Sequence, residues 1–117
     1  MKNFKQLLIW QKGFDIAKQS FTLIESFPKE ERFSLSNQIT RAAVSIPSNI
    51  AEGSSRSSEK DYNRFCEHSL GSAFELETQL LIADSINYGN QLIRAKLLQD
   101  VSEEQRMLMS FMSKLKK

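Results

Sequence analysis

The spacing of apolar residues constrains this chain most, because they recur every three or four positions through four long segments. The first segment, residues 4–27, carries two such stripes. One consists of Leu7, Trp10, Phe14, Ala17, Phe21 and Ile24, and the other of Ile9, Ile16, Leu23 and Phe27. Each spacing follows one side of an α-helix. A helix on the outside of a bundle buries one apolar side, so the second stripe predicts a contact with something else.

Proline and glycine separate the segments. Phe27 precedes Pro28 and is therefore pushed out of the helical region, which ends the first helix. A second helix is expected from about residue 34 to 54. Its stripe consists of Leu35, Ile39, Ala42, Ile46 and Ile50. Because this stripe continues past Pro47, that proline predicts a kink and not an end.

The third and fourth helices follow by the same logic. Ser57 or Ser58 caps the third, which runs to about residue 86, and the fourth covers about residues 91–114. Residues 87–90, Asn-Tyr-Gly-Asn, form the turn between them. Four long helices joined by short turns predict an all-α fold, an antiparallel up-down four-helix bundle, in a single domain over residues 1–117.

Composition narrows the function classes. A chain of 117 residues with 40% apolar and 26% charged residues is large and mixed enough to fold as one domain. The lone Cys66 and lone His68 predict neither a disulfide nor a metal site, and no string for phosphate, dinucleotide or hydrolase chemistry is present. We expect no cofactor and no enzymatic activity. Without a signal peptide or a long apolar run, we expect a cytoplasmic protein that does not enter the membrane.

The charges are unevenly distributed, although the net charge is only +2. Residues 57–86 hold six acids and two bases, and residues 90–117 hold six bases and three acids. Opposite charges on neighbouring segments suit lateral pairing of the helices, and the pattern favours a solvated face over a nucleic-acid patch.

A polar stripe runs along the second helix. It consists of Gln38, Arg41, Ser45, Ser48 or Asn49, Glu52 and Arg56. Two acids of the third helix, Glu75 and Glu77, are candidate partners of this stripe. Three interpretations are open: a solvated outer face, a structural network, or a ligand or nucleic-acid site. In the network, Asn49 and Glu52 would satisfy backbone groups left by Pro47, and Arg41 would pair with Glu75 or Glu77.

Several strings resemble the 23S ribosomal RNA intervening-sequence proteins, a family of four-helix bundle proteins. They are FPKEER at residues 27–32, RAAVSIPSNIAEG at 41–53, WQK at 10–12, GS at 71–72 and ELETQL at 75–80. The resemblance covers nearly the whole chain. Gly13 departs from the alanine typical of the family, which should loosen the first helix slightly.

The resemblance implies a compact four-helix subunit, a ring-like homopentamer, and genes lying in insertions of bacterial large-subunit ribosomal RNA genes. A related branch is the accessory protein of diversity-generating retroelements, a basic pentameric barrel that binds nucleic acid and a reverse transcriptase. With a charge of only +2 per subunit, this chain should bind phosphates modestly. For the intervening-sequence branch the resemblance assigns no biochemical activity.

Two function classes remain open. The first is a non-enzymatic oligomeric scaffold that contacts RNA or DNA through basic residues on one surface of the ring. The candidates are Lys12, Lys18, Arg56, Lys60 and Arg64. Tyr62 is the one aromatic residue near the last two that could stack on a base. The second class is an adaptor that binds a partner protein and no nucleic acid.

Overall fold

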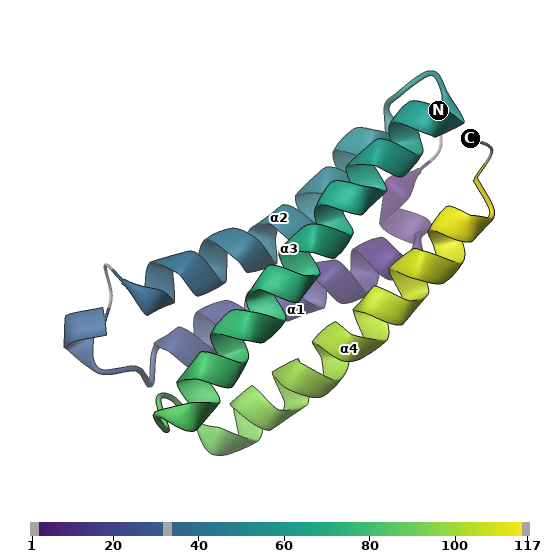
Figure 1. Ribbon diagram of the computed structural model, residues 1–117. Helices are drawn as coiled ribbons and strands as arrows, with labels where there is room; N and C mark the ends of the chain where they lie inside the picture. The colour runs from purple at the N-terminus through teal and green to yellow at the C-terminus, as the bar shows by residue number, and fades with distance from the viewer. Residues whose placement is uncertain (1–2, 32–33, 116–117) are drawn as a thin grey trace.

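The computed structural model describes residues 3–31 and 34–115 of the chain. Its helices are α1 (Leu8–Ile24), α2 (Leu35–Ser54), α3 (Glu59–Ser85) and α4 (Gln91–Ser113), with short 3-10 turns η1 (Phe4–Gln6) and η2 (Lys29–Glu31). They form an elongated antiparallel bundle of 44 × 22 × 20 Å (Figure 1). The predicted all-α four-helix bundle is confirmed.

The order of the helices around the bundle follows the order of the chain. α1 packs against α2 and α4, and α3 packs against the same two helices. α1 and α3 therefore lie diagonally opposite each other. The sides of α1 and α3 that face away from the core therefore lie on different sides of the bundle.

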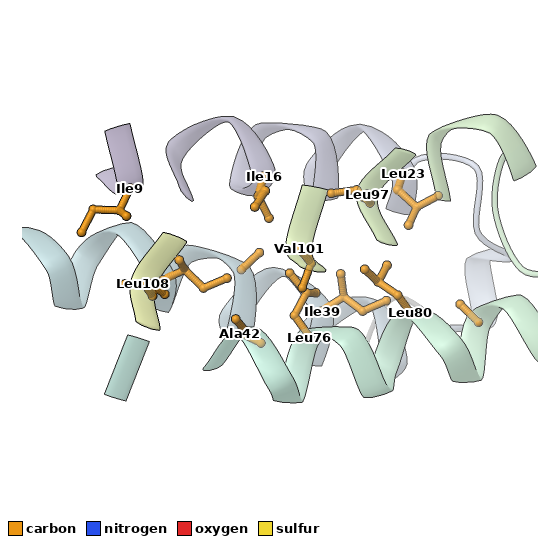
Figure 2. Close-up of a cluster of buried hydrophobic side chains, with 14 of the residues drawn as sticks. Ile9, Ile16, Leu23, Ile39, Ala42, Leu76, Leu80, Leu97, Val101 and Leu108 are labelled. Carbon is orange, nitrogen blue, oxygen red and sulfur yellow. The ribbon is translucent and has the colours of Figure 1, made fainter. Parts of the chain in front are cut away.

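The core lies along the axis of the bundle. From α1 it takes Ile9, Ile16 and Leu23, which belong to the second of the two stripes. Figure 2 shows these side chains pointing toward residues of the other helices, including Ile39, Leu76, Leu80, Leu97 and Val101. In the first stripe of α1, Phe14 and Phe21 are about half exposed, at 48% and 51%. The other members, Leu7, Trp10, Ala17 and Ile24, are partly buried against the core.

The first helix is shorter than its apolar pattern predicted. Leu7 is extended and serves as the N-cap of α1, and the helix ends at Ile24 instead of Phe27. The Ser26 hydroxyl donates to the carbonyl of Leu23 at 2.8 Å and accepts from the backbone amide of Asn90 at 2.8 Å. Since Ser26 bonds the last turn of α1 to the start of α4, the chain leaves the helix before Pro28.

The turn between α3 and α4 is fixed from inside. The Arg94 guanidinium is buried and donates to the carbonyls of Tyr88 and Gly89 at 2.6 and 3.0 Å, and to Asp84 Oδ1 at 2.8 Å. Gly89 has a φ of +83°, and a Cβ there would come within 2.7 Å of the Phe27 ring. Both its conformation and the close approach of Phe27 therefore require glycine at this position.

Pro47 lies inside α2, and the helix continues to Ser54 as its periodicity predicted. Ser58 caps α3, with its hydroxyl accepting from the amide of Asp61 at 3.1 Å. The turn between α2 and α3 lies at one end of the bundle, beside the C-terminal end of α4 (Figure 1).

Candidate nucleic-acid and assembly surfaces

Three of the five predicted basic residues gather at the α2–α3 turn. Arg56 follows the end of α2, and Lys60 and Arg64 lie in the first turns of α3. The Arg56 and Arg64 guanidinium carbons lie 4.5 and 5.0 Å from the centre of the Phe65 ring. We call Arg56, Lys60, Arg64 and Phe65 the turn cluster. It combines positive charge with an aromatic ring, the two features of protein surfaces that bind single-stranded nucleic acid.

Acids lie directly beside both arginines. Glu52 pairs with Arg56 at 3.0 Å, and Asp61 pairs with Arg64 at 3.0 Å. These pairs are exposed, so each stabilises the fold by at most about 1 kcal/mol and can exchange with a phosphate. They nevertheless reduce the local positive potential.

The aromatic residue expected from the sequence is the wrong one. Tyr62 is only 4% exposed and packs edge-on against Phe111, with ring centres 5.5 Å apart. Burial raises the pKa of its hydroxyl to about 12. Phe65 is half buried and takes the place beside the arginines. Phe65 is three residues from Tyr62 and therefore lies on nearly the same side of the helix, so spacing alone could not show which of the two rings is beside the arginines.

The other two predicted basic residues lie elsewhere. Lys12 sits between α1 and α4, 3.1 Å from Glu103 and 3.5 Å from Asp100. Burial alone would lower the pKa of Lys12, but the hydrogen bond to Glu103 and the two carboxylate charges outweigh burial and raise it. Lys18 is exposed at an apolar groove between α1 and α2. The five residues therefore do not form one surface of the subunit.

The polar stripe of α2 divides into two parts. In the inner part, Asn49 Nδ2 donates to the carbonyl and hydroxyl oxygens of Ser45 at 2.9 and 2.8 Å, and the Ser45 hydroxyl bonds that of Ser72 on α3 at 2.8 Å. This part is a small network linking α2 to α3. The carbonyl that Pro47 leaves without its helical partner is that of Ala43, and Asn49 bonds a different one.

The outer part does not form the expected ion pairs. Within the described ranges, no ion pair joins Arg41 to Glu75 or Glu77. Glu77 instead accepts from Gln105 Nε2 on α4 at 2.9 Å. Gln38, Arg41 and Glu75 line an open polar groove of about 350 Å³. The remaining member, Glu52, bonds Arg56 at the turn and not a backbone group near Pro47.

An apolar groove on the outside of α1 and α2 is the second surface of interest. It has a volume of about 380 Å³ and is lined by Trp10, Phe14 and Phe21 from α1 and by Val44 and Pro47 from α2. Trp10 and Phe14 stack with their ring centres 5.1 Å apart. We call this surface, to which Trp10, Phe14, Ala17 and Phe21 of the first stripe contribute, the α1–α2 groove.

A buried carboxyl group, that of Glu104 on α4, lies against the side of α1 that faces the core. The sequence analysis did not single out this residue. Glu104 is completely buried, and neither of its oxygens has a hydrogen-bond partner among the described residues. A Cβ on Gly13 would lie 3.1 Å from Glu104 Oε2 and 3.4 Å from the nitrogen of Pro47. Burial raises the pKa of Glu104 to about 8, although the charge of Lys12 opposes the shift. An alanine at position 13 would place its methyl group against this carboxyl, so the close approach of Glu104 favours glycine there.

Cys66 and His68 occupy ordinary positions. Cys66 is buried, and burial raises the pKa of its thiol to about 11. His68 is exposed. In the described part of the chain, no group of three or more His, Cys, Asp or Glu side chains could hold a metal ion. None of the helices described there has the length and apolar character needed to cross a membrane.

These features define a four-helix bundle subunit with an outward apolar groove and a basic aromatic cluster at one turn. The model of the 23S rRNA-intervening sequence protein family matches residues 5–110, and the chain belongs to this family. The resemblance seen in the sequence is thereby confirmed.

A solved structure shows the same fold. It is a protein with unknown function from the S23 ribosomal protein family of Bacteroides thetaiotaomicron. The two structures agree with a TM-score of 0.80 at 23% identity, over 90% of this chain and 98% of that chain. None of the curated proteins compared with the chain matches it.

Proposed function

We propose that this chain is a non-enzymatic scaffold of the bacterial cytoplasm that assembles into a ring-like homopentamer and contacts RNA. The observation that carries the proposal is the α1–α2 groove, where Phe14 and Phe21 leave about half of their side-chain surfaces in water. A contiguous exposed apolar surface of this kind marks a site of protein association. The number five comes from the family resemblance.

Contact with RNA rests on the turn cluster and on the family's description as 23S rRNA-intervening sequence proteins. The guanidinium groups of Arg56 and Arg64 lie over the Phe65 ring and offer two positive charges beside it. Such a surface holds phosphates and stacks on an unpaired base without reading its identity. In a ring, each subunit presents one copy, and the effect of the small net charge is multiplied.

Assembly is tested by light scattering of the purified protein at micromolar concentration. A mass of five 13.5 kDa subunits is the expected result. A 13.5 kDa particle at every concentration would contradict the scaffold.

RNA contact is tested separately, by fluorescence anisotropy with labelled single-stranded, duplex and structured RNA at low salt. Changing Arg56, Lys60 and Arg64 together to Gln should weaken binding equally for unrelated sequences. It should also flatten the salt dependence by about 0.7–0.9 per lost phosphate contact. A matched control changes Lys29, Lys96 and Arg106 to Gln, which removes the same charge away from the turn cluster. If both triple variants bind alike, the turn cluster is not the site.

The adaptor class is the second candidate. One observation favours it: Glu52 and Asp61 already pair with the two arginines of the turn cluster. A surface of paired charges around an aromatic ring also suits a protein partner. A pentamer without detectable RNA binding at tens of micromolar protein would favour the adaptor.

A further inference from the structure

The outer face of α3 carries a second exposed apolar surface. Phe74 and Leu81 are 47% and 52% exposed. They are seven residues apart, so they lie on the same side of the helix two turns from each other. Glu67 lies a further seven residues before Phe74 and is also exposed. We call Glu67, Phe74 and Leu81 the α3 face.

The α3 face matches the α1–α2 groove in character. Phe14 and Phe21 are likewise seven residues apart, with Lys18 between them. The groove therefore combines apolar surface with a positive charge, and the α3 face combines it with a negative one. In the described part of the chain, neither Lys18 nor Glu67 has an ion-pair partner. Apolar surface with opposite charges is the complementarity expected of two surfaces that meet.

The positions of the two surfaces are also complementary. α1 and α3 lie diagonally opposite in the bundle, with α2 and α4 between them (Figure 1). The groove lies between α1 and α2, and the α3 face lies on the helix diagonally opposite α1, so the two are separate surfaces of the chain. Two different surfaces can join copies head to tail, and such contacts close into a ring when the rotation between neighbours allows it.

We infer that the α3 face of one subunit docks into the α1–α2 groove of the next copy of this chain. This inference rests on the proposed assembly and names its contact surfaces. Pairing of groove with groove across a two-fold axis fits less well. It would bring the Lys18 side chains of the two molecules toward each other, where their like charges repel. It would also leave Phe74 and Leu81 in water.

Two variants that break one surface each provide the test. Phe21→Asp places a charge in the groove, and Phe74→Asp places one on the α3 face. Leu92→Asp is the matched control, because Leu92 is 81% exposed near the start of α4 and belongs to neither surface. All three positions are at least 47% exposed, so each variant should fold, which circular dichroism verifies.

Each of the first two variants should be a monomer by light scattering, while Leu92→Asp keeps the wild-type mass. Mixing the two monomers in equal amounts should give a heterodimer and nothing larger. The heterodimer joins the one intact groove to the one intact α3 face, and its remaining two surfaces are both broken.

The outcomes separate this inference from the assembly itself. If wild-type protein is an oligomer and Phe74→Asp keeps that mass, the α3 face is not a contact surface, and the inference fails while the assembly stands. If both variants are monomers but their mixture stays monomeric, the two surfaces do not bind each other. If wild-type protein is a monomer, the proposed assembly fails and the inference with it.

Discussion

The two sides of α1 reverse the usual distribution of polar and apolar groups. On its inner side, at Gly13, the helix meets the buried carboxyl of Glu104. On its outer side, Phe14 and Phe21 hold their rings half in water. Since a buried carboxyl without a partner and an exposed aromatic surface both oppose the stability of a lone subunit, neither is explained by folding alone.

Under the proposed assembly, the two sides of α1 act in different equilibria. Residues on the inner side contribute to the folding of the single chain, which is independent of protein concentration. Residues on the outer side would contribute on assembly, and their effect would then depend on protein concentration. Concentration and pH therefore provide separate ways to examine the two sides.

The largest effect is expected from truncating the inner side. Ile16 is completely buried in the core, so Ile16→Ala should lower the free energy of unfolding by about 2–5 kcal/mol at every protein concentration. Phe14→Ala should cost less than about 1 kcal/mol in the dissociated subunit. Urea unfolding over a hundredfold range of protein concentration measures both.

Similar behaviour of the two variants would contradict the separate roles of the inner and outer sides. A concentration-independent loss of several kcal/mol in Phe14→Ala would show that the outer rings are part of the core of a single subunit. The α1–α2 groove would then not be an assembly surface.

The second effect is a dependence of the free energy of unfolding on pH, which comes from Glu104 on the inner side of α1. The pKa of Glu104 rises from an ordinary 4.5 to about 8 in the folded chain. Between these values the folded protein holds a proton that the unfolded chain has released. Stability should therefore be greatest below about pH 4.5 for this group and fall as the pH rises, by about 1.4 kcal/mol per unit, until about pH 8.

Glu104→Gln is the control, because the amide keeps the shape and cannot ionise. Its stability should vary little between pH 5 and 8. The other shifted groups titrate outside this window: the pKa of Asp100 is held low, and those of Cys66 and Tyr62 are about 11 and 12. An equal slope in both proteins would show that Glu104 is already ionised when folded.

Periodicity was sufficient to predict the fold, because a repeat of three and four sustained over twenty residues has no alternative to a helix. It also predicted that α1 has two apolar sides. It could not tell which stripe supplies the fully buried core: Ile16 and Leu23 are completely buried, whereas Phe14 and Phe21 of the other stripe are half exposed. Packing between helices decides this, and side-chain size on one helix does not.

The candidate site was less predictable, for physical reasons that differ between residues. Glu104 could have been found, since it stands three residues after Val101 and four before Leu108 in the apolar stripe of α4. The missing contact of Arg41 with Glu75 could not, because both side chains are exposed and their distance depends on the spacing of two helices. Phe65 rather than Tyr62 beside the arginines depends on how α3 is rotated in the bundle.

The smallest effect concerns the space at Gly13. Alanine favours a helix over glycine by about 1 kcal/mol. In this protein, however, the new methyl group would lie 3.1 Å from both Glu104 Oε2 and Ile46 Cγ2. We expect the crowding to offset the gain, so that Gly13→Ala changes the free energy of unfolding little.

The contact with Glu104 can be isolated by a double-mutant cycle. When Glu104→Ala removes the carboxyl, Gly13→Ala should stabilise the protein by about 1 kcal/mol more than it does in the wild type. The contact with Ile46 is present in both backgrounds and cancels. Urea unfolding of the four proteins at pH 5, where Glu104 is neutral, gives the coupling without a contribution from its charge. A coupling of zero would mean that the two residues do not share the space, and the inner side of α1 would then tolerate alanine at position 13 whatever stands at position 104.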